Sequence, residues 1–364
     1  MSHSRLFAAD PASLKANQNK NRTRRDFIKL ASTALLVSGI SGCCDFTPSV
    51  STPVFYGYQT FGRAQGAALN MNVFYPTLDG SPQNAAFYSG CGNYPVIIFL
   101  HGNGTSYRTW VDLPGTLARA GFVVVVPDTQ LGVDQVVGDC INAVSFLFRS
   151  STFSKYLAHT IGLCGHSLGG GAAMQVAIGL SARACGALSP DINGWFNLGP
   201  PYSQLTMPLL IEWGDGEVYD PVATEQFDLS IPAEAAAWNM FNRPKHLVVV
   251  VGGHHFDYVP PGSLDLFTDG IQRGPCTLTP LITTDFVVSF FSKYMKPSYV
   301  AIPDTLIPPP YTPTPSQAFY DGLFLEAFRY FQPNQHHQKG DPCWFTQHWE
   351  TNNTVKPIGD IGLG

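Results

Sequence analysis

Apolar residues along this chain form two kinds of segment that alternate from about residue 55 onward. Continuous apolar runs at Tyr94–Leu100 and at 122–126 are typical of strands that are buried on both faces of a sheet. Apolar residues with helical spacing at 110–120 and 135–148 predict amphipathic helices. The same patterns predict further strands at 68–75, 160–164, 184–188, 209–213 and 246–251, and further helices at 168–180 and 284–295.

This alternation of strands and helices predicts the fold class. Strands that are joined by helices form a mostly parallel sheet with helices on both faces. The alternation continues to about residue 296, so we expect one α/β domain over residues 55–296.

Beyond residue 296 the pattern changes to a proline-rich and aromatic-rich extension, residues 297–364. Seven prolines between residues 297 and 315 interrupt any periodicity, which predicts an extended chain there. Residues 316–331 have the composition of one more helix. We expect the extension to have no strand of its own and to pack on the domain through its aromatic side chains.

The first 42 residues have the pattern of an export signal. A twin-arginine sequence, Arg24-Arg25-Asp26-Phe27, precedes an apolar stretch at 30–42 that is too short to span a bilayer. Ile40-Ser41-Gly42-Cys43 is similar to a lipobox, which predicts a lipid on Cys43 and attachment to a membrane through it. The alternative is ordinary cleavage that leaves a periplasmic or secreted protein. Residues 43–54 would then be a linker.

Charge changes the picture of possible partners. Seven of the 21 Lys and Arg residues and two of the 26 acidic residues precede Cys43, which leaves a net charge of −10 on the remainder. Because phosphate would repel such a chain, we expect no nucleic-acid partner.

The cysteines fit an oxidising compartment. Cys164 and Cys185 lie within apolar runs and are expected to be buried thiols. The loop cysteines are disulfide candidates, with Cys276–Cys343 and Cys91–Cys140 as the expected pairs and Cys140–Cys276 as the competing one. No CxxC pair or HExxH sequence is present, so we expect neither a metal nor a cofactor.

The chemistry of the chain centres on Gly165-His166-Ser167-Leu168-Gly169. This G-x-S-x-G sequence follows a predicted strand and precedes a predicted helix, where a sharp turn would expose the Ser167 hydroxyl as a nucleophile. The N–H of Leu168, at the start of that helix, would be one donor of an oxyanion hole.

A serine nucleophile needs a base, and the base needs a group that orients it. Two neighbouring histidines, His254 and His255, follow the last predicted strand of the domain, and one of them is the expected base. The acidic candidates follow the strand at 209–213 and are Asp215, Glu217 and Asp220.

Together, the loop at 101–106, the serine, the acid and the histidine stand in the chain order of an α/β-hydrolase, and residues 55–296 resemble that family. The GHSLGG and GGHHF sequences are similar to bacterial cutinases and polyester hydrolases, and to chlorophyllase-like and dienelactone-hydrolase-like esterases. The HGNGTS loop also resembles haloalkane dehalogenases, but those use an Asp nucleophile where this chain has Ser167.

The resemblance implies a role for several residues. A small residue followed by His and an aromatic residue selects His255 as the base, with His254 beside it. The usual spacing of the acid selects Glu217, although aspartate is commoner there. The HG sequence implies that the N–H of Asn103 is the second oxyanion donor and that His101 packs under the loop.

These residues predict a serine hydrolase that cleaves small or polymeric carboxylic esters through an acyl-enzyme. The short connection between residues 188 and 209 leaves no room for a large lid. An amidase or peptidase with the same triad, or a non-catalytic surface lipoprotein of this fold, are the alternatives.

Overall fold

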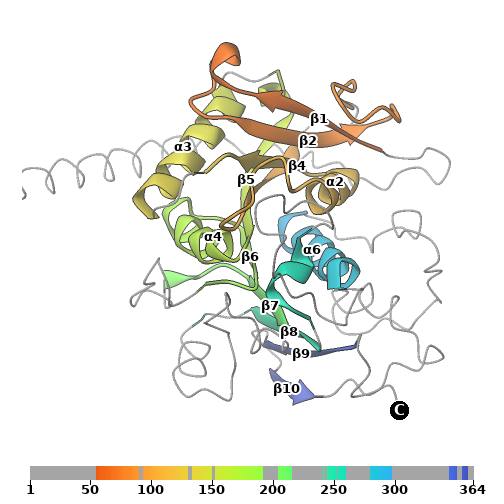
Figure 1. Ribbon diagram of the computed structural model, residues 1–364, viewed down its shortest axis with the longest axis vertical. Coiled ribbons are helices and arrows are strands. Elements are labelled where there is room, and N and C mark those ends of the chain that lie inside the picture. Colours follow the sequence, from red (N-terminus) through yellow and green to blue (C-terminus); the bar gives the residue numbers. More distant parts are fainter. Residues whose placement is uncertain are drawn as a thin grey trace, which may run out of the picture. The chain divides into compact units, whose positions relative to one another are not determined.

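The computed structural model describes residues 55–89, 93–129, 133–149, 152–191, 204–214, 241, 244–251, 253–259, 279–296, 344–350 and 355–359. Its centre is a ten-stranded sheet in the order β1-β2-β4-β3-β5-β6-β7-β8-β9-β10 (Figure 1). The strands are β1 (Phe55–Phe61), β2 (Met71–Thr77), β3 (Tyr94–Leu100), β4 (Val123–Pro127), β5 (Leu157–His166), β6 (Ala184–Leu188), β7 (Leu209–Gly214), β8 (Lys245–Val251), β9 (Trp344–Glu350) and β10 (Val355–Gly359).

The middle of the sheet is parallel and its two edges are antiparallel. Strands β4, β3, β5, β6, β7 and β8 pair in parallel. At one edge β1 and β2 pair antiparallel to each other and β2 to β4, and at the other edge β8, β9 and β10 do the same. Since β3, β5, β6 and β8 run in one direction, the segments that follow them all emerge at the carboxyl-terminal ends of the parallel strands.

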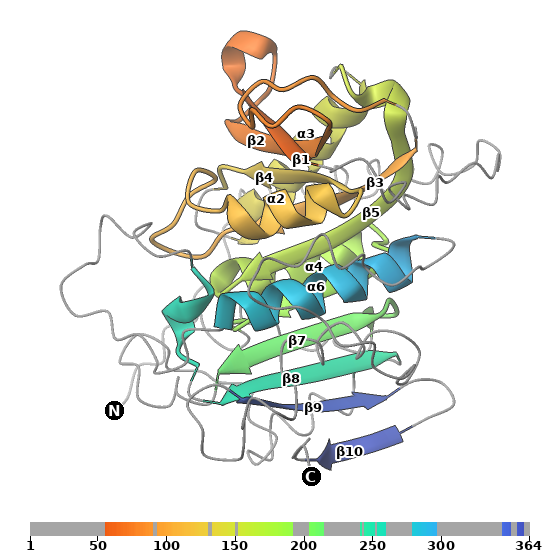
Figure 2. The same ribbon diagram turned by 90° about the vertical axis from the view of Figure 1, so that its right-hand side faces the viewer.

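Within the described residues, four α-helices cover the two faces of the sheet, and three short 3-10 helices lie in its connections. Helices α3 and α4 lie on one face, and α2 and α6 on the other (Figures 1 and 2). Their bounds are α2 (Asp112–Arg119), α3 (Val133–Arg149), α4 (Leu168–Gly179) and α6 (Thr279–Met295), with the 3-10 helices η1 (Arg63–Gln65), η2 (Ser154–Tyr156) and η5 (His255–Tyr258).

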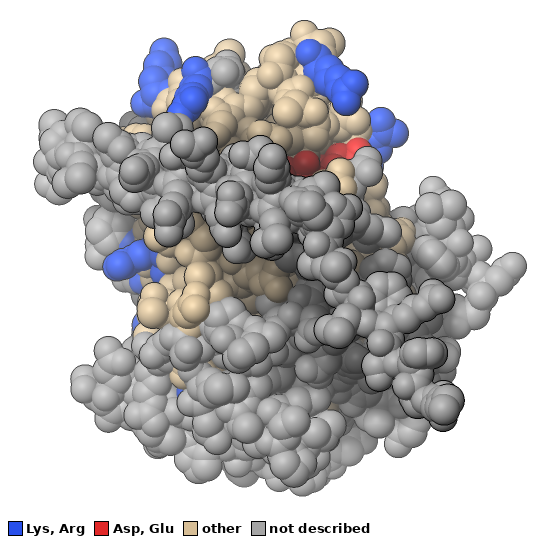
Figure 3. Space-filling model, turned by 90° about the vertical axis from the view of Figure 1, so that its left-hand side faces the viewer, with Lys and Arg blue, Asp and Glu red and all other residues tan. Residues whose placement is uncertain are grey.

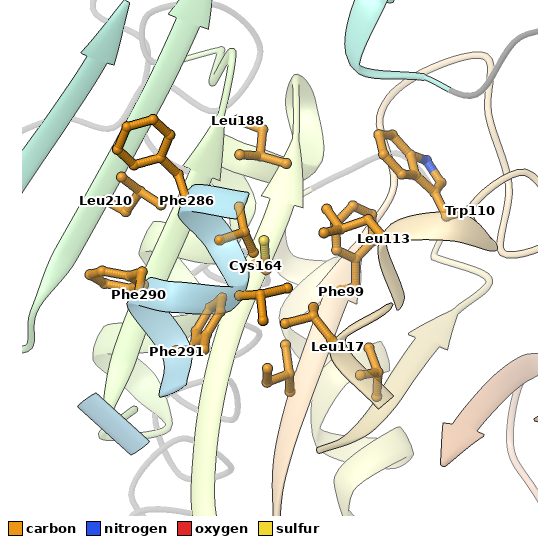
Figure 4. Close-up of a cluster of buried hydrophobic side chains, with 14 of the residues drawn as sticks. Phe99, Trp110, Leu113, Leu117, Cys164, Leu188, Leu210, Phe286, Phe290 and Phe291 are labelled. Atoms are coloured by element: carbon orange, nitrogen blue, oxygen red, sulfur yellow. The ribbon is translucent and has the colours of Figure 1, made fainter. Parts of the chain in front are cut away.

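The larger hydrophobic core lies between the sheet and the pair α2 and α6. Phe286, Phe290 and Phe291 of α6 belong to this core together with Cys164 of β5, and Leu113 and Leu117 of α2 complete it (Figure 4). Burying a side chain of phenylalanine size stabilises a fold by about 1.5–3 kcal/mol. This core therefore fixes α6 against the parallel strands and the segments that follow their carboxyl-terminal ends.

The predicted fold class is confirmed, and most elements lie where the hydrophobic pattern placed them. Strands β3 and β6 have the predicted ends, whereas α6 begins at Thr279 rather than at residue 284 and β5 begins at Leu157 rather than at residue 160. The pattern did not predict β1, whose residues are exposed or partly buried except for the buried Gly57.

The expectation that the extension has no strand of its own is wrong. Trp344–Glu350 forms β9, which pairs with β8 over seven residue pairs from Lys245–Glu350 to Val251–Trp344. Val355–Gly359 forms β10 beside it. The physical reason is long-range, because β8 leaves an edge whose backbone groups need partners. The helix expected at 316–331 lies outside the described residues.

The cysteines correct one further expectation. Cys140 is a free thiol, fully buried in α3, so its predicted pairing with Cys91 and the competing pairing with Cys276 are both wrong. Its helix turns the side chain into the core, where burial raises the pKa of the thiol. Cys164 and Cys185 are buried and free, as predicted. Cys91, Cys276 and Cys343 lie outside the described residues.

The surface and the N-terminal segment add little to the placement of a site. On the face in Figure 3, the described Lys and Arg side chains lie at separate points, and most of the described area between them is uncharged. No helix in the described ranges has the length and apolar character needed to cross a bilayer. The expected signal at 1–42, with Cys43, and the linker at 43–54 lie outside those ranges.

Candidate active site

Ser167 stands on the sharp turn between β5 and α4. Its backbone has φ 56° and ψ −126°, a strained conformation for a residue other than glycine. A β-carbon on Gly169, two residues later, would lie 2.2 Å from the carbonyl oxygen of Leu100, so only glycine allows α4 to approach β3 this closely. The turn therefore holds the Ser167 hydroxyl at the end of β5 with little freedom.

His255 is the side chain in contact with this hydroxyl. It begins η5, shortly after β8, and its Nε2 lies 2.8 Å from Ser167 Oγ, which is hydrogen-bond distance. The two residues are 88 positions apart in the chain, and the parallel strands β5 and β8 bring them together. The structure thus joins the serine and the histidine that the sequence selected.

The other ring nitrogen of His255 contacts a residue that the sequence analysis did not select. Ser189, directly after β6, has its Oγ 2.7 Å from His255 Nδ1. Ser189 is 3% exposed and has φ 43°. Its one sequence signal was its place directly after the buried strand beside the nucleophile strand, and a serine in that place is not distinctive.

His166 supports the backbone of the base. Its Nε2 lies 2.8 Å from the carbonyl oxygen of His255, and the two rings are 4.9 Å apart. Because a carbonyl oxygen only accepts, His166 carries its proton on Nε2 and donates it. Burial, and then the nearby His255, hold the pKa of His166 well below its usual range, so the ring is neutral.

His254 has different surroundings from its neighbour. Its backbone N–H donates to the carboxylate of Asp257 at 2.8 Å, which closes the first turn of η5. Its side chain is buried. The acidic candidates Asp215, Glu217 and Asp220 lie outside the described residues, so the contacts here are those of the histidines and of Ser189.

The loop after β3 lies against the nucleophile. A β-carbon on Gly102 would lie 2.9 Å from Ser167 Cβ, so this backbone touches the serine closely because it has no side chain. The carbonyl oxygen of Gly102 accepts from His101 Nδ1 at 3.0 Å and from Thr105 Oγ1 at 3.0 Å. In a trans peptide the next N–H points the opposite way, so these bonds fix the direction of the Asn103 N–H.

His101 packs beneath this loop. It is 8% exposed, and its Nε2 lies 3.3 Å from Thr129 Oγ1. Burial lowers the pKa of His101, so the ring stays neutral while its Nδ1–H holds the Gly102 carbonyl.

The other expected oxyanion donor, Leu168, heads α4. Its N–H belongs to the first turn, whose N–H groups lack helical partners and whose dipole favours negative charge. Within the described residues, no three His, Cys, Asp or Glu side chains are grouped to hold a metal ion.

A family model and a curated protein both match this chain. A model of the alpha/beta hydrolase family matches residues 97–308. A curated protein of Streptomyces coelicolor named bis(hydroxyethyl) terephthalate hydrolase is 28% identical over 168 residues, which are 44% of this chain and 49% of that protein. The chain thus spans about half the length of this relative.

Proposed function

Since this chain belongs to the alpha/beta hydrolase family, we propose that it is a serine hydrolase that cleaves carboxylic esters through an acyl-enzyme. The observation that carries the proposal is the 2.8 Å contact between Ser167 Oγ and His255 Nε2 at a strained strand-to-helix turn. A hydroxyl becomes a competent nucleophile when a positioned base removes its proton.

In the proposed reaction, Ser167 Oγ attacks the ester carbonyl carbon while its proton moves to His255 Nε2. The carbonyl oxygen becomes an oxyanion that accepts from the N–H groups of Leu168 and Asn103. The fixed Gly102 carbonyl supports this role for Asn103. The intermediate then expels the alcohol, which takes the proton from His255 and leaves the acyl-enzyme. Water attacks the acyl carbon while its proton moves to His255, and the acid leaves as Ser167 Oγ takes that proton back.

A carboxylate would stabilise the imidazolium that forms on His255, and Glu217 remains our candidate, with Asp215 and Asp220 as alternatives. The test compares two isosteric changes. Glu217→Gln should lower kcat more than Asp215→Asn does, because only the carboxylate near His255 stabilises its charge. A larger loss in the Asp215 variant would reassign the acid.

Bulky aromatic esters are the proposed substrate class. The support is the name of the relative, which denotes a hydrolase of an ester of an aromatic dicarboxylic acid, and the short connection between β6 and β7. Bis(hydroxyethyl) terephthalate is therefore the first substrate to assay, beside p-nitrophenyl esters of increasing chain length.

A fluorophosphonate probe tests the function. The wild-type protein should be labelled on Ser167, as located by peptide mass spectrometry, and should hydrolyse p-nitrophenyl esters faster than the matching anilide. Ser167→Ala should lose both labelling and turnover while remaining folded, whereas Ser181→Ala, at the other end of α4, should keep both. An unlabelled wild type would indicate a non-catalytic protein, and faster anilide cleavage would indicate an amidase.

We also propose export by the twin-arginine route and a lipid on Cys43, which would place the protein in the cell envelope. The support is the order of the twin arginines, the short apolar stretch and the lipobox-like residues. Intact mass spectrometry should find a lipid on an N-terminal Cys43, and an unmodified N-terminus would contradict the anchor. Non-reducing peptide mapping checks the Cys276–Cys343 pairing, which stays a prediction.

A further inference from the structure

Backbone hydrogen bonds hold Ser189 and its neighbour Leu188 in place at the end of β6. Its backbone has φ 43°, which is uncommon for serine, and its N–H donates to the Glu212 carbonyl at 2.5 Å. The preceding residue, Leu188, accepts the N–H of Ser167 at 2.9 Å. The nucleophile and the Ser189 hydroxyl are therefore fixed to the same end of β6.

We propose that Ser189 is the positioning residue of His255, and that its hydroxyl oxygen accepts the Nδ1–H of the imidazole. The proposal rests on the proposed function, because it assigns a role within that reaction. It goes beyond it by adding an uncharged hydroxyl in direct contact with the base, at 2.7 Å from its Nδ1.

In the proposed arrangement His255 has the tautomer that the reaction needs. With its proton on Nδ1 and donated to Ser189, His255 presents the lone pair of Nε2 to the Ser167 O–H. When the Oγ–carbon bond forms, the Ser167 proton joins Nε2, the Nδ1–H stays where it is, and the leaving alcohol later takes the Nε2 proton. No further reactant is required.

The electrostatic consequence differs from that of a carboxylate in the same place. A hydroxyl orients the ring but adds no negative charge to stabilise the imidazolium. Among the described titratable side chains, the His166 ring lies against that of His255 and is neutral, and Asp257, on η5 itself, accepts the backbone N–H of His254. A charge placed at position 189 should therefore change the pH dependence of the base.

The experiment compares Ser189→Ala, Ser189→Asp and the control Ser181→Ala in the full-length protein, using kcat, KM and the pH profile of kcat/KM on a p-nitrophenyl ester. Ser181 is a suitable control because it also has a left-handed backbone, with φ 50°, but lies exposed at the far end of α4. Asparagine and aspartate tolerate this conformation, so Ser189→Asp is compatible with the turn.

We expect Ser189→Ala to lower kcat about tenfold or more with KM little changed, since the loss of one hydrogen bond misorients the base and not the substrate. Ser189→Asp should raise the kinetic pKa of the base by about one unit, because an opposite charge favours the imidazolium. Ser181→Ala should match the wild type in both measurements.

Wild-type kcat in a folded Ser189→Ala, or an unchanged kinetic pKa in Ser189→Asp, would overturn the proposal. If Ser189→Ala does not fold, the pH profile of Ser189→Asp decides alone. The outcome is separable from the proposed function, since a wild type that reacts with fluorophosphonate at Ser167 keeps that function even if Ser189 proves unimportant.

Discussion

Two neighbouring histidines show how the site depends on single residues. His255 reaches Ser167 through Nε2, while His254 takes part in η5 through its backbone N–H and the Asp257 carboxylate. Both side chains are buried, so burial alone does not distinguish a base from a structural residue. What distinguishes them is the contact that each makes, since His255 meets Ser167 Oγ through its ring and His254 meets Asp257 through its backbone N–H.

This contrast gives a prediction for matched alanine variants. His255→Ala should lower kcat/KM about as far as Ser167→Ala does, by roughly 1,000-fold or more, because residues that act as a unit fail together. His254→Ala, which keeps the backbone bond to Asp257, should cost about tenfold or less. Steady-state kinetics on one p-nitrophenyl ester measures all three, and equal losses in the two histidine variants would show that His254 belongs to the reacting group.

At this scale the sequence predicted the residues that carry a motif and missed the one that does not. Ser167 was selected by the glycines around it. The place after the last predicted strand selected the pair His254 and His255, and the resemblance to the family selected His255. Ser189 has no such signal, because a serine after a strand usually serves a turn. Its contact with His255 depends on the distance between two chain segments that are 66 residues apart.

At the scale of elements, α4 has different requirements at its two ends. Gly169 faces the backbone of β3, where a β-carbon would lie 2.2 Å from the Leu100 oxygen and 2.4 Å from the His101 oxygen. A β-carbon on Gly179, in the last turn, would meet no heavy atom within 4 Å. One helix thus contains a glycine that packing requires and another that packing does not.

The same substitution at these two positions should have opposite effects. Gly169→Ala should destabilise the protein by about 1–3 kcal/mol and lower activity, because the backbone at the end of β3 must move away from the turn that carries Ser167. Gly179→Ala should stabilise it by about 0.5–1 kcal/mol, since alanine favours a helix more than glycine does. Urea unfolding of both variants decides this, and a stable, fully active Gly169→Ala would contradict the packing argument.

Local pattern predicted the elements that are buried and regular, and failed where pairing is decided at a distance. The solid apolar runs of β3 and β6 have the predicted ends because both faces of each strand are covered. Strands β9 and β10 follow a proline-rich segment and depend on β8 for a partner, so no local signal marked them. Pairing of this kind depends on tertiary contact.

At the scale of the whole molecule, the sheet assembles a site from four distant segments. Each segment follows one of the strands β3, β5, β6 and β8, and the parallel direction of these strands brings the segments together at their carboxyl-terminal ends. The residues that they contribute are Gly102, Ser167, Ser189 and His255. The core packs α6 against the strands that carry these segments (Figures 2 and 4). The same core encloses a carboxyl group that couples the stability of the whole fold to pH.

Glu212 of β7 is fully buried, and its Oε1 accepts from Thr283 Oγ1 of α6 at 2.5 Å. Burial raises the pKa of this carboxyl from 4.5 to about 8, and the Thr283 hydrogen bond opposes only part of that shift. The folded protein therefore binds a proton at Glu212 that the unfolded chain releases above about pH 4.5. Between these two values, raising the pH favours the unfolded state.

We therefore expect Glu212 to make the free energy of unfolding fall as pH rises from about 4.5 to about 8, by at most about 1.4 kcal/mol per pH unit. His246 acts in the opposite sense, because burial lowers its pKa from 6.5 to about 3, so the folded state loses stability as the pH falls from about 6.5 to about 3. Glu212→Gln isolates the first effect, since His246 is common to both proteins.

The difference between the two unfolding curves is the measurement. Glu212→Gln replaces the titrating carboxyl by an amide of similar shape, which changes stability by an amount that does not depend on pH. Relative to the wild type, the variant should gain stability steadily from about pH 4.5 and reach a plateau above about pH 8, as measured by urea unfolding at intervals of one pH unit. A difference that stays constant across this range would mean that Glu212 keeps its ordinary pKa, and that the core around Thr283 is accessible to water.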